Sequence, residues 1–348
     1  MSASRKKKSS SPIRFEFDNQ QLASYLEDHV AGFSGPLTAR KFSNGQSNPT
    51  FLVEAASGQY VLRRKPPGPL LKSAHAVDRE YRVMTALAGS DVPVPRTYHL
   101  CEDPSVIGSV FFLMEYIHGR VLWNPALPDF SPDERRPIFD EMNRVLAAVH
   151  SVDIDAAGLS DYGKPGNYFE RQVGRWSAQY RATETEAIPE VDTIMAWLGA
   201  NTPADDGRVA LVHGDYRLDN MIFHPSEPRV LALVDWELST LGHPFADLAY
   251  QCMQWRFDGG GMIPGLGHVD RESLGIPGEA EYVDMYCRRL GISGISNWNF
   301  YLVFSYFRLV AILQGVRKRA LEGNASNARA LELGDMVRPL ALKAAELI

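Results

Sequence analysis

Residues 211–237 read LVHGDYRLDNMIFHPSEPRVLALVDWE, and this stretch decides the fold of the chain. Its apolar runs predict a short buried strand at residues 209–212 and a hairpin with strands at residues 221–224 and 230–234. A turn rich in Pro and Ser joins the hairpin strands. Polar residues stand at the ends of these apolar elements, namely Asp215, Asn220 and Asp235. Such groups seldom stand beside buried strands unless they are paired or bind a ligand, so they are candidate functional residues.

The spacing of these residues matches a phosphoryl-transfer site. Asn220 follows Asp215 by five positions, and Asp235 follows fifteen positions later. In a kinase catalytic loop, H-R-D-x-x-x-x-N, the Asp accepts the proton of the acceptor hydroxyl, and the Asn and a later D-F-G Asp bind metal. Here H-G-D-x-x-x-x-N and D-W-E stand in those places. The alternative is an unrelated strand–turn–strand with solvated carboxylates, but spacing, hairpin and apolar strands together favour the kinase-like interpretation.

These motifs resemble the aminoglycoside phosphotransferase and choline kinase group, the small-molecule branch of the kinase-like fold. The longer strings HGDYRLDN and DWELSTLGHPFADLAY look most like the kinase-like domains found alone or fused to acyl-CoA dehydrogenases. The resemblance implies an α+β, protein-kinase-like fold with two lobes. We expect a disordered tail at residues 1–17, an N-lobe with a small antiparallel sheet at 18–117, and a mainly helical C-lobe at 118–348.

The resemblance also implies ATP and Mg²⁺ as cofactors and assigns roles. Asp215 would orient or deprotonate the acceptor, while Asn220 and Asp235 would bind the metal. Arg63, in Tyr-Val-Leu-Arg, stands where kinases have the Lys of V-A-I-K; Arg keeps the charge but has a different geometry. Glu80, on a helix predicted at residues 73–89, would pair with it. Lys65 is the second choice for the phosphate-binding cation. The alternatives are exposed basic residues on an edge strand and an ordinary solvated Glu.

Two further segments are assigned to nucleotide binding by their position. Residues 44–49, between strands predicted at 38–43 and 50–55, lie where a kinase fold covers the triphosphate. The segment has one Gly, so it is not G-x-G-x-x-G, and a plain hairpin turn is the alternative. Its backbone amides would donate to phosphates together with three side chains, those of Ser47, Asn48 and Thr50. After a strand predicted at 110–116, the backbone around Glu115 and Ile117 would meet the adenine edge.

Other patterns predict how the catalytic loop is supported. A D-x-x-Q cap starts a helix at Asp18, and a capping box starts another at Ser131. His213 is interpreted as a structural hydrogen-bonding residue and not as the base, and the resemblance gives Asp247 an orienting role. Residues 158–186 look like an inserted helical hairpin, which either lines the acceptor pocket or packs on itself.

Composition limits the remaining possibilities. The net charge of −6 over 348 residues argues against general nucleic-acid binding. The three cysteines are far apart and form no C-x-x-C pair, which fits a reducing, cytoplasmic compartment. The basic start, MSASRKKKSSSP, lacks an apolar segment behind it and is expected to be a disordered tail, with a targeting or membrane-surface role as the lesser alternative. Residues 300–316 are apolar but interrupted by Arg308 and Gln314, so we expect a core helix and no membrane span.

The expected function is ATP-dependent transfer of the γ-phosphoryl group to a hydroxyl of a small molecule. The resemblance points to a hydroxyacyl compound or its CoA ester; the alternatives are an aminoglycoside or choline-type kinase and a non-catalytic nucleotide-binding module. Aminoglycosides are polycations, yet residues 151–190 carry seven acidic and four basic residues, only a mild excess. Aromatic residues in the expected pocket segments suit a partly apolar acceptor: Tyr168, Phe169, Trp176, Tyr180, Trp255 and Phe257. The sequence does not indicate the oligomeric state.

Overall fold

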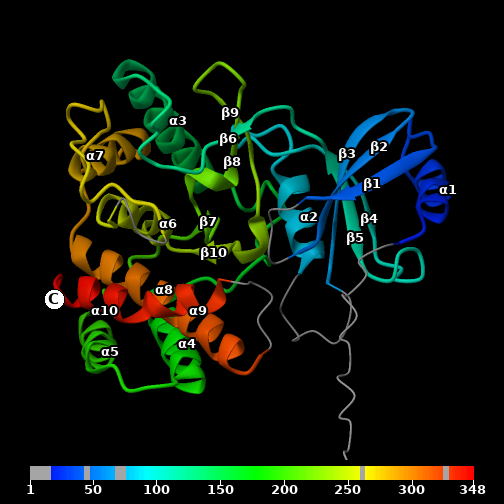
Figure 1. Cartoon of the computed structure of the whole chain (residues 1–348). Helices are drawn as coiled ribbons and strands as arrows, with labels where there is room; N and C mark the ends of the chain where they lie inside the picture. The colour runs from blue at the N-terminus through cyan, green and yellow to red at the C-terminus, as the bar shows by residue number, and fades with distance from the viewer. Residues whose placement is uncertain (1–16, 43–47, 67–75, 259–262, 324–328) are drawn as a thin grey trace, which may run out of the picture. The chain divides into compact units, whose positions relative to one another are not determined.

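The computed structural model describes residues 17–42, 48–66, 76–258, 263–323 and 329–348 (Figure 1). The chain divides into two compact units, Met1–Asp78 with Thr97–Tyr116, and Arg79–Arg96 with Ile117–Ile348. The predicted disordered tail lies almost wholly outside the described residues. Helix α2 (Val77–Ala86) crosses the division between the units.

Residues 79–96 were predicted in the N-lobe but group with the second unit. The physical reason is the packing of Arg79, whose guanidinium donates to the Tyr162 carbonyl oxygen at 2.7 Å and lies 4.1 Å from the centroid of the Tyr162 ring. Arg82 adds an ion pair with Asp161 in the same unit. The predicted lobe boundaries themselves stay a prediction.

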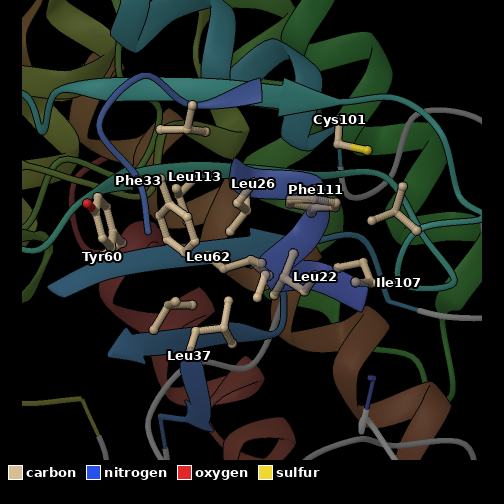
Figure 2. Close-up of a cluster of buried hydrophobic side chains, with 14 of the residues drawn as sticks. Leu22, Leu26, Phe33, Leu37, Tyr60, Leu62, Cys101, Ile107, Phe111 and Leu113 are labelled. Atoms are coloured by element: carbon tan, nitrogen blue, oxygen red, sulfur yellow. The ribbon is translucent and has the colours of Figure 1, made fainter. Parts of the chain in front are cut away.

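The first unit is built on a five-stranded antiparallel sheet. Its strand order is β1-β2-β3-β5-β4, with bounds Leu37–Lys41, Thr50–Ala55, Gly58–Arg64, Phe111–Glu115 and Thr97–Cys101. Helix α1 (Asn19–His29) buries Leu22 and Leu26 in a cluster with Leu62 and Leu113 (Figure 2). Burial of such apolar side chains is the main stabilising contribution to a unit of this size.

The start of α1 explains where the helix begins. The Asp18 carboxylate accepts the backbone N–H groups of Gln20 at 2.8 Å and Gln21 at 3.2 Å, which satisfies donors that have no partner within the helix. The predicted cap is therefore confirmed. The Gln21 side chain does not complete a capping box, because it donates to the Ser105 carbonyl instead.

The second unit is mainly helical and carries two small sheets. Strand β7 (Ala210–Val212) pairs with β10 (Thr240–Gly242), and β6 (Arg120–Val121), β8 (Met221–Phe223) and β9 (Val230–Leu233) form the other sheet. The antiparallel hairpin β8–β9 confirms the predicted one. The helices are α3 (Pro132–His150), α4 (Tyr168–Thr183), α5 (Pro189–Asn201), α6 (Phe245–Cys252), α7 (Glu279–Leu290), α8 (Trp298–Leu321), α9 (Ala330–Asp335) and α10 (Val337–Ala345). With its antiparallel sheets and many helices, the chain belongs to the predicted α+β class.

Helix α8 is the central helix of the second unit. It packs against α4, α5, α6, α9 and α10 (Figure 1). By length and composition it is apolar enough to cross a membrane, but 83% of its apolar window is buried inside the protein. That burial is what the core-helix prediction requires.

The predicted helical hairpin at residues 158–186 has different bounds. Only α4 lies within that segment, and its helical partner α5 follows after Ile188, with Pro189 in the first turn. Gly and Pro residues keep the chain before α4 irregular, and Pro at a first helical turn favours a new start. The hairpin therefore exists as α4–α5, further along the chain than predicted.

Candidate active site

The loop that carries Asp215 follows the buried strand β7 and is hydrogen-bonded to helix α6. The Asp247 carboxylate accepts the backbone N–H of His213 at 2.6 Å and that of Gly214 at 2.9 Å. Asp247 is buried, and burial raises the pKa of its carboxyl; the hydrogen bonds from His150 and the Gly214 N–H oppose this, and the pKa lies below its ordinary value. Asp247 is thus ionised and orients the loop, as predicted.

His213 is fully engaged in structural hydrogen bonds. Its Nδ1 accepts the backbone N–H of Asp215 at 3.2 Å, so Nε2 carries the proton and donates to the Val234 carbonyl oxygen at 3.0 Å. A histidine with both ring nitrogens occupied cannot also take a proton from an acceptor. This confirms the structural interpretation of His213.

Gly214 makes the sharp turn between these residues. Its φ is +85°, and a Cβ atom there would lie 2.6 Å from the carbonyl oxygen of Leu238. Both the left-handed backbone and the close approach exclude a side chain. The turn sends the chain from β7 into the loop that carries Asp215.

Both carboxylate oxygens of Asp215 accept hydrogen bonds from side chains. The Tyr250 hydroxyl donates to Oδ1 at 2.8 Å, and the Asn220 Nδ2 donates to Oδ2 at 3.0 Å. Burial raises the pKa of the carboxyl, but Arg217, the Tyr250 hydrogen bond and Arg308 outweigh it and hold the pKa below its ordinary value. Asp215 is therefore a fixed, ionised carboxylate with lone pairs left for one more donor.

Asn220 and Asp235 lie at corresponding ends of β8 and β9. The Val234 N–H donates to the Asn220 carbonyl oxygen at 2.9 Å, so the residue before Asp235 is bonded directly to Asn220. Asp235 itself has φ +69° and ends the hairpin in the left-handed conformation. The sequence-predicted set of Asp215, Asn220 and Asp235 is thus assembled within the second unit.

The side-chain chemistry of Asn220 and Asp235 fits Mg²⁺. The Asn220 Nδ2 is turned toward Asp215, donating to its carbonyl at 2.8 Å and its carboxylate, which directs the amide oxygen away. Amide and carboxylate oxygens are ligands that Mg²⁺ accepts, together with phosphate oxygens and water. Asn220 and Asp235 supply two side-chain ligands, so phosphate oxygens and water would complete the coordination.

Arg217 is a site residue that the sequence analysis missed. Its Nη2 donates to Asp219 Oδ2 at 2.7 Å, and its Nε lies 3.5 Å from Asp215 Oδ1. Burial lowers the pKa of the guanidinium, but Asp215, Asp219 and Asp235 raise it above its ordinary value. The sequence feature that could have identified Arg217 is a basic residue within an acidic loop, two positions after Asp215.

Arg308 and His150 also support the loop and were not assigned this role. Arg308 on α8 donates from Nη2 to the Gly214 carbonyl oxygen and is almost fully buried. His150 lies 3.4 Å from Asp247 through Nε2 and 2.6 Å from the Tyr286 hydroxyl through Nδ1. His150, at the end of α3, thus pairs with the carboxylate that holds the loop. The sequence feature that could have identified Arg308 is a charged residue within an apolar helix, because buried charges are usually paired.

The first unit carries the residues predicted to contact the nucleotide phosphates. On β3, Leu62 faces the α1 core and buried Arg64 donates to the Ile107 carbonyl, so Arg63 lies on the opposite face of the sheet. Arg63 stands directly across from Thr50 on β2. Lys65, the second choice, forms an ion pair with Asp78 at 2.9 Å.

The remaining nucleotide-site predictions are placed as follows. Asn48 is buried, and Glu115 ends β5 half-buried. Ser47 lies outside the described residues. Glu80 and Ile117 belong to the second unit, and Glu80 is 1% exposed, so the alternative of a solvated glutamate is wrong. The Arg63–Glu80 pair would join both units and stays a prediction.

The aromatic residues expected to line an acceptor pocket are mostly core residues. Trp176, Tyr180, Trp255 and Phe257 are all buried. Trp255, for example, packs in the core with its ring centroid 4.8 Å from that of Tyr282, at a tilt of 43°. Tyr168 and Phe169 do line a cavity of about 730 Å³ in the second unit, together with residues of the α5–β7 connection and the start of α8. Aromatic content alone therefore does not define the acceptor pocket.

Comparison with known proteins identifies the family. The model of the phosphotransferase enzyme family (APH) matches residues 38–300. This chain belongs to that phosphotransferase enzyme family.

Similar sequences place the chain more narrowly. Acyl-CoA dehydrogenase family member 10 of Mus musculus is 49% identical over 322 residues, or 92% of this chain. Acyl-CoA dehydrogenase family member 11 of Rattus norvegicus is 42% identical over 331 residues, or 94% of this chain. The chain spans 30% and 42% of the lengths of these two relatives. The predicted likeness to domains of acyl-CoA dehydrogenase proteins is confirmed.

Solved structures confirm the kinase-like fold. A candidate aminoglycoside phosphotransferase from Ralstonia eutropha has a TM-score of 0.88 and 52% identity, over 95% of this chain and 98% of that chain. Spectinomycin phosphotransferase APH(9)-Ia, solved with ADP and spectinomycin, has a TM-score of 0.61 and 14% identity, over 94% and 98%. A thermostable mutant of aminoglycoside phosphotransferase APH(4)-Ia, solved with AMP-PNP and hygromycin B, also has a TM-score of 0.61 and 14% identity, over 94% of this chain and 98% of that chain. At 14% identity the last two comparisons support the fold alone.

Proposed function

We propose that this chain is an ATP-dependent small-molecule kinase, which moves the γ-phosphoryl group of ATP to a hydroxyl of its acceptor. One observation carries the proposal: an ionised Asp215, fixed by two hydrogen-bond donors, lies beside Asn220 in the loop of a phosphotransferase-family chain. In phosphoryl transfer the protein contributes mainly position and charge, and this loop supplies both.

Each residue has a separate part in the proposed reaction. Asp215 orients the acceptor hydroxyl and receives its proton. Asn220 and Asp235 hold Mg²⁺, which when bound would neutralise charge on the phosphates. Arg63 contacts the phosphates from its sheet face. Thr50, Asn48 and Ser47 donate to the phosphates, and the backbone at Glu115 and Ile117 meets the adenine.

We propose a hydroxyacyl compound, free or as its CoA thioester, as the acceptor. The support is the likeness to proteins named acyl-CoA dehydrogenase family members 10 and 11. The mild acidity of residues 151–190, seven acidic against four basic, argues further against a polycationic acceptor. An aminoglycoside remains the second candidate because the similar Ralstonia eutropha structure is named for that activity. The aromatic residues no longer support either choice, since most of them are core residues.

A direct screen of acceptors tests this function. Purified chain with Mg·ATP would be given kanamycin, choline, hydroxyacids and hydroxyacyl-CoA esters, and the phosphorylated product would be followed by phosphorus NMR. We expect turnover of the hydroxyacyl compounds that is lost in Asp215→Asn. Efficient turnover of kanamycin, with none of the hydroxyacyl compounds, would contradict the acceptor assignment. Absence of turnover with all acceptors would favour the non-catalytic nucleotide-binding module.

We also propose that the protein works in a reducing compartment such as the cytoplasm. The support is that Cys101, Cys252 and Cys287 are all free and buried in the structure. Buried thiols of this kind need no oxidising environment to form the fold.

A further inference from the structure

Helix α6 contacts the catalytic loop through two side chains on one face. Asp247 and Tyr250 are three positions apart, which places them one above the other on a helix. Asp247 holds the loop backbone through two N–H groups, whereas the Tyr250 hydroxyl donates to the Asp215 carboxylate at 2.8 Å. The first contact sets the path of the loop, and the second reaches the side chain proposed to act as the base.

Tyr250 is itself held rigidly. It is buried, with 7% of its surface exposed, and the guanidinium carbon of Arg308 lies 5.2 Å from its ring centroid. Arg308 also donates to the Gly214 carbonyl oxygen, next to Asp215 in the chain. A cation over an aromatic face is attractive, particularly where water is excluded. The ring is therefore confined by its packing, and its hydroxyl donates to Oδ1 of Asp215.

The direction of that hydrogen bond follows from the chemistry of the two groups. Burial raises the pKa of the Tyr250 hydroxyl, so it keeps its proton and acts as the donor. Within the part of the chain that the structure describes, Asp215 is the hydrogen-bond partner of this hydroxyl. Packing of the ring requires only an aromatic residue, whereas the hydroxyl supplies the bond to Asp215.

Competing interactions show what this bond prevents. The Nε of Arg217 lies 3.5 Å from the same oxygen, Oδ1, and Arg217 already pairs with Asp219 at 2.7 Å. Without the Tyr250 donor, one oxygen of Asp215 would be held by Asn220 and the other would be free to turn toward Arg217. Such a rotation removes lone pairs from the direction that an acceptor hydroxyl needs.

We propose that Tyr250 is a positioning residue for the phosphotransferase reaction, which holds the Asp215 carboxylate in the orientation that receives the acceptor's proton. The inference rests on the proposed function of Asp215. It adds a residue outside the loop motif, and it explains why an aromatic hydroxyl is buried against an ionised carboxylate.

The test compares two Tyr→Phe variants, Tyr250→Phe and Tyr216→Phe. Tyr216 is fully buried and its hydroxyl donates to the Met142 carbonyl oxygen at 2.6 Å, so this control loses a buried hydroxyl beside the same loop without touching the Asp215 carboxylate. We expect Tyr250→Phe to lower kcat by about ten- to a hundredfold, the effect of one hydrogen bond to a charged group. The KM for ATP should change less than about twofold, because the bond serves the acceptor side.

The control and the outcomes separate positioning from general damage. Tyr216→Phe should keep kcat near that of the wild type even if its Tm falls more. Wild-type kcat in Tyr250→Phe, or equal losses in both variants, would overturn the inference. Turnover is measured with the acceptor found in the screen and with water as acceptor, as ATP hydrolysis.

Crystallography of the variants tests this inference separately from the proposed function. Crystal structures of both variants would show the Asp215 side chain directly, whether or not an acceptor is known. We expect the carboxylate to turn toward Arg217 only in Tyr250→Phe. An unchanged carboxylate there would refute the positioning role, whereas absence of turnover in the wild type with a turned carboxylate would refute only the kinase assignment.

Discussion

The chemistry of the candidate site depends on how two carboxylates of similar sequence context are used differently. Asp215 has its pKa held low despite burial, whereas burial raises the pKa of Asp219, with Asp215 and Asp235 adding to the rise against Arg217. Asp215 accepts donors on both oxygens, while Asp219 pairs with Arg217. The loop thus keeps the Asp215 carboxylate ionised and fixed, whereas the Asp219 carboxylate pairs with the Arg217 guanidinium.

This difference predicts the effect of removing each carboxylate. Asp215→Asn should lower phosphoryl transfer by about a hundredfold or more, because a positioned base is lost, and Mg·ATP binding should persist. Asp219→Asn is the matched control, since it removes one negative charge from the same loop. Steady-state kinetics and calorimetry would measure the two effects. If Asp215→Asn turned over like the wild type, the base would have to be another residue.

The cation on β3 offers a second test at the residue scale. Arg63→Ala should weaken ATP binding far more than Arg63→Lys, because Lys keeps the charge and loses only the planar fork. Lys65→Ala is the control: Lys65 lies two positions on and pairs with Asp78. Titration calorimetry with Mg·ATP gives the three affinities. A loss in Lys65→Ala with none in Arg63→Ala would transfer the phosphate-binding role to Lys65.

At the scale of elements, the backbone conformation of short connections positions the residues of the candidate site. The turn at Gly214 and the end of β9 at Asp235 both use the left-handed backbone region, with φ of +85° and +69°. Gly adopts this region freely, whereas Asp does so at some cost, and such strain is frequent at functional positions. The hairpin between these two points also has a register shift at Ile222 and Phe223, so both the loop and the hairpin that carry the site depart from regular geometry.

The two glycines Gly214 and Gly174 give a matched prediction. Gly214→Ala should destabilise the protein by about 2 kcal/mol or more, because φ is positive and a Cβ would meet the Leu238 carbonyl. Gly174, inside α4, has open space around its Cβ position, so Gly174→Ala should stabilise by about 0.5–1 kcal/mol through helix propensity. Urea unfolding of both variants measures the change. Equal effects of the two substitutions would contradict the role of the Gly214 turn.

At the scale of the whole molecule, ligand binding and stability are linked. A ligand that binds only the folded chain stabilises it, by about 2.7 kcal/mol at a concentration a hundredfold above its Kd. If Asn220 and Asp235 hold Mg²⁺ with the phosphates, stabilisation by ATP must depend on both the metal and Asp235. One amide and one carboxylate are too few for Mg²⁺ without phosphate oxygens, so losing the carboxylate leaves little affinity.

Thermal unfolding tests this linkage on the full chain. ATP with Mg²⁺ should raise the Tm of the wild type, and chelation of the metal with EDTA should remove most of the rise. Asp235→Ala should show little rise in either condition, whereas Asp219→Asn should behave as the wild type. A metal-dependent rise that survives in Asp235→Ala would show that the metal is held elsewhere.

Local patterns were enough to predict much of the second unit's central region. The hairpin β8–β9 and the loop bearing Asp215 and Asn220 follow from apolar runs and turn residues that lie within a few positions of one another. The bounds of the α4–α5 pair were predicted less well. The segment before α4 contains Gly158, Gly163, Pro165 and Gly166, which keep it out of a helix until Tyr168.

Within single stretches of chain, the sequence alone determined the family motif, the order of strands and helices around it, and the spacing of Asp215, Asn220 and Asp235. Only the tertiary structure decided which distant groups meet that loop. Tyr250 reaches Asp215 across 35 positions, Arg308 reaches Gly214 across 94, and His150 lies 97 positions from Asp247. Hydrophobic periodicity reports which face of an element is buried, but not which buried polar partner it will meet. Those partners are set when α3, α6 and α8 pack, because a buried charge is stable only where the packing supplies its hydrogen bonds.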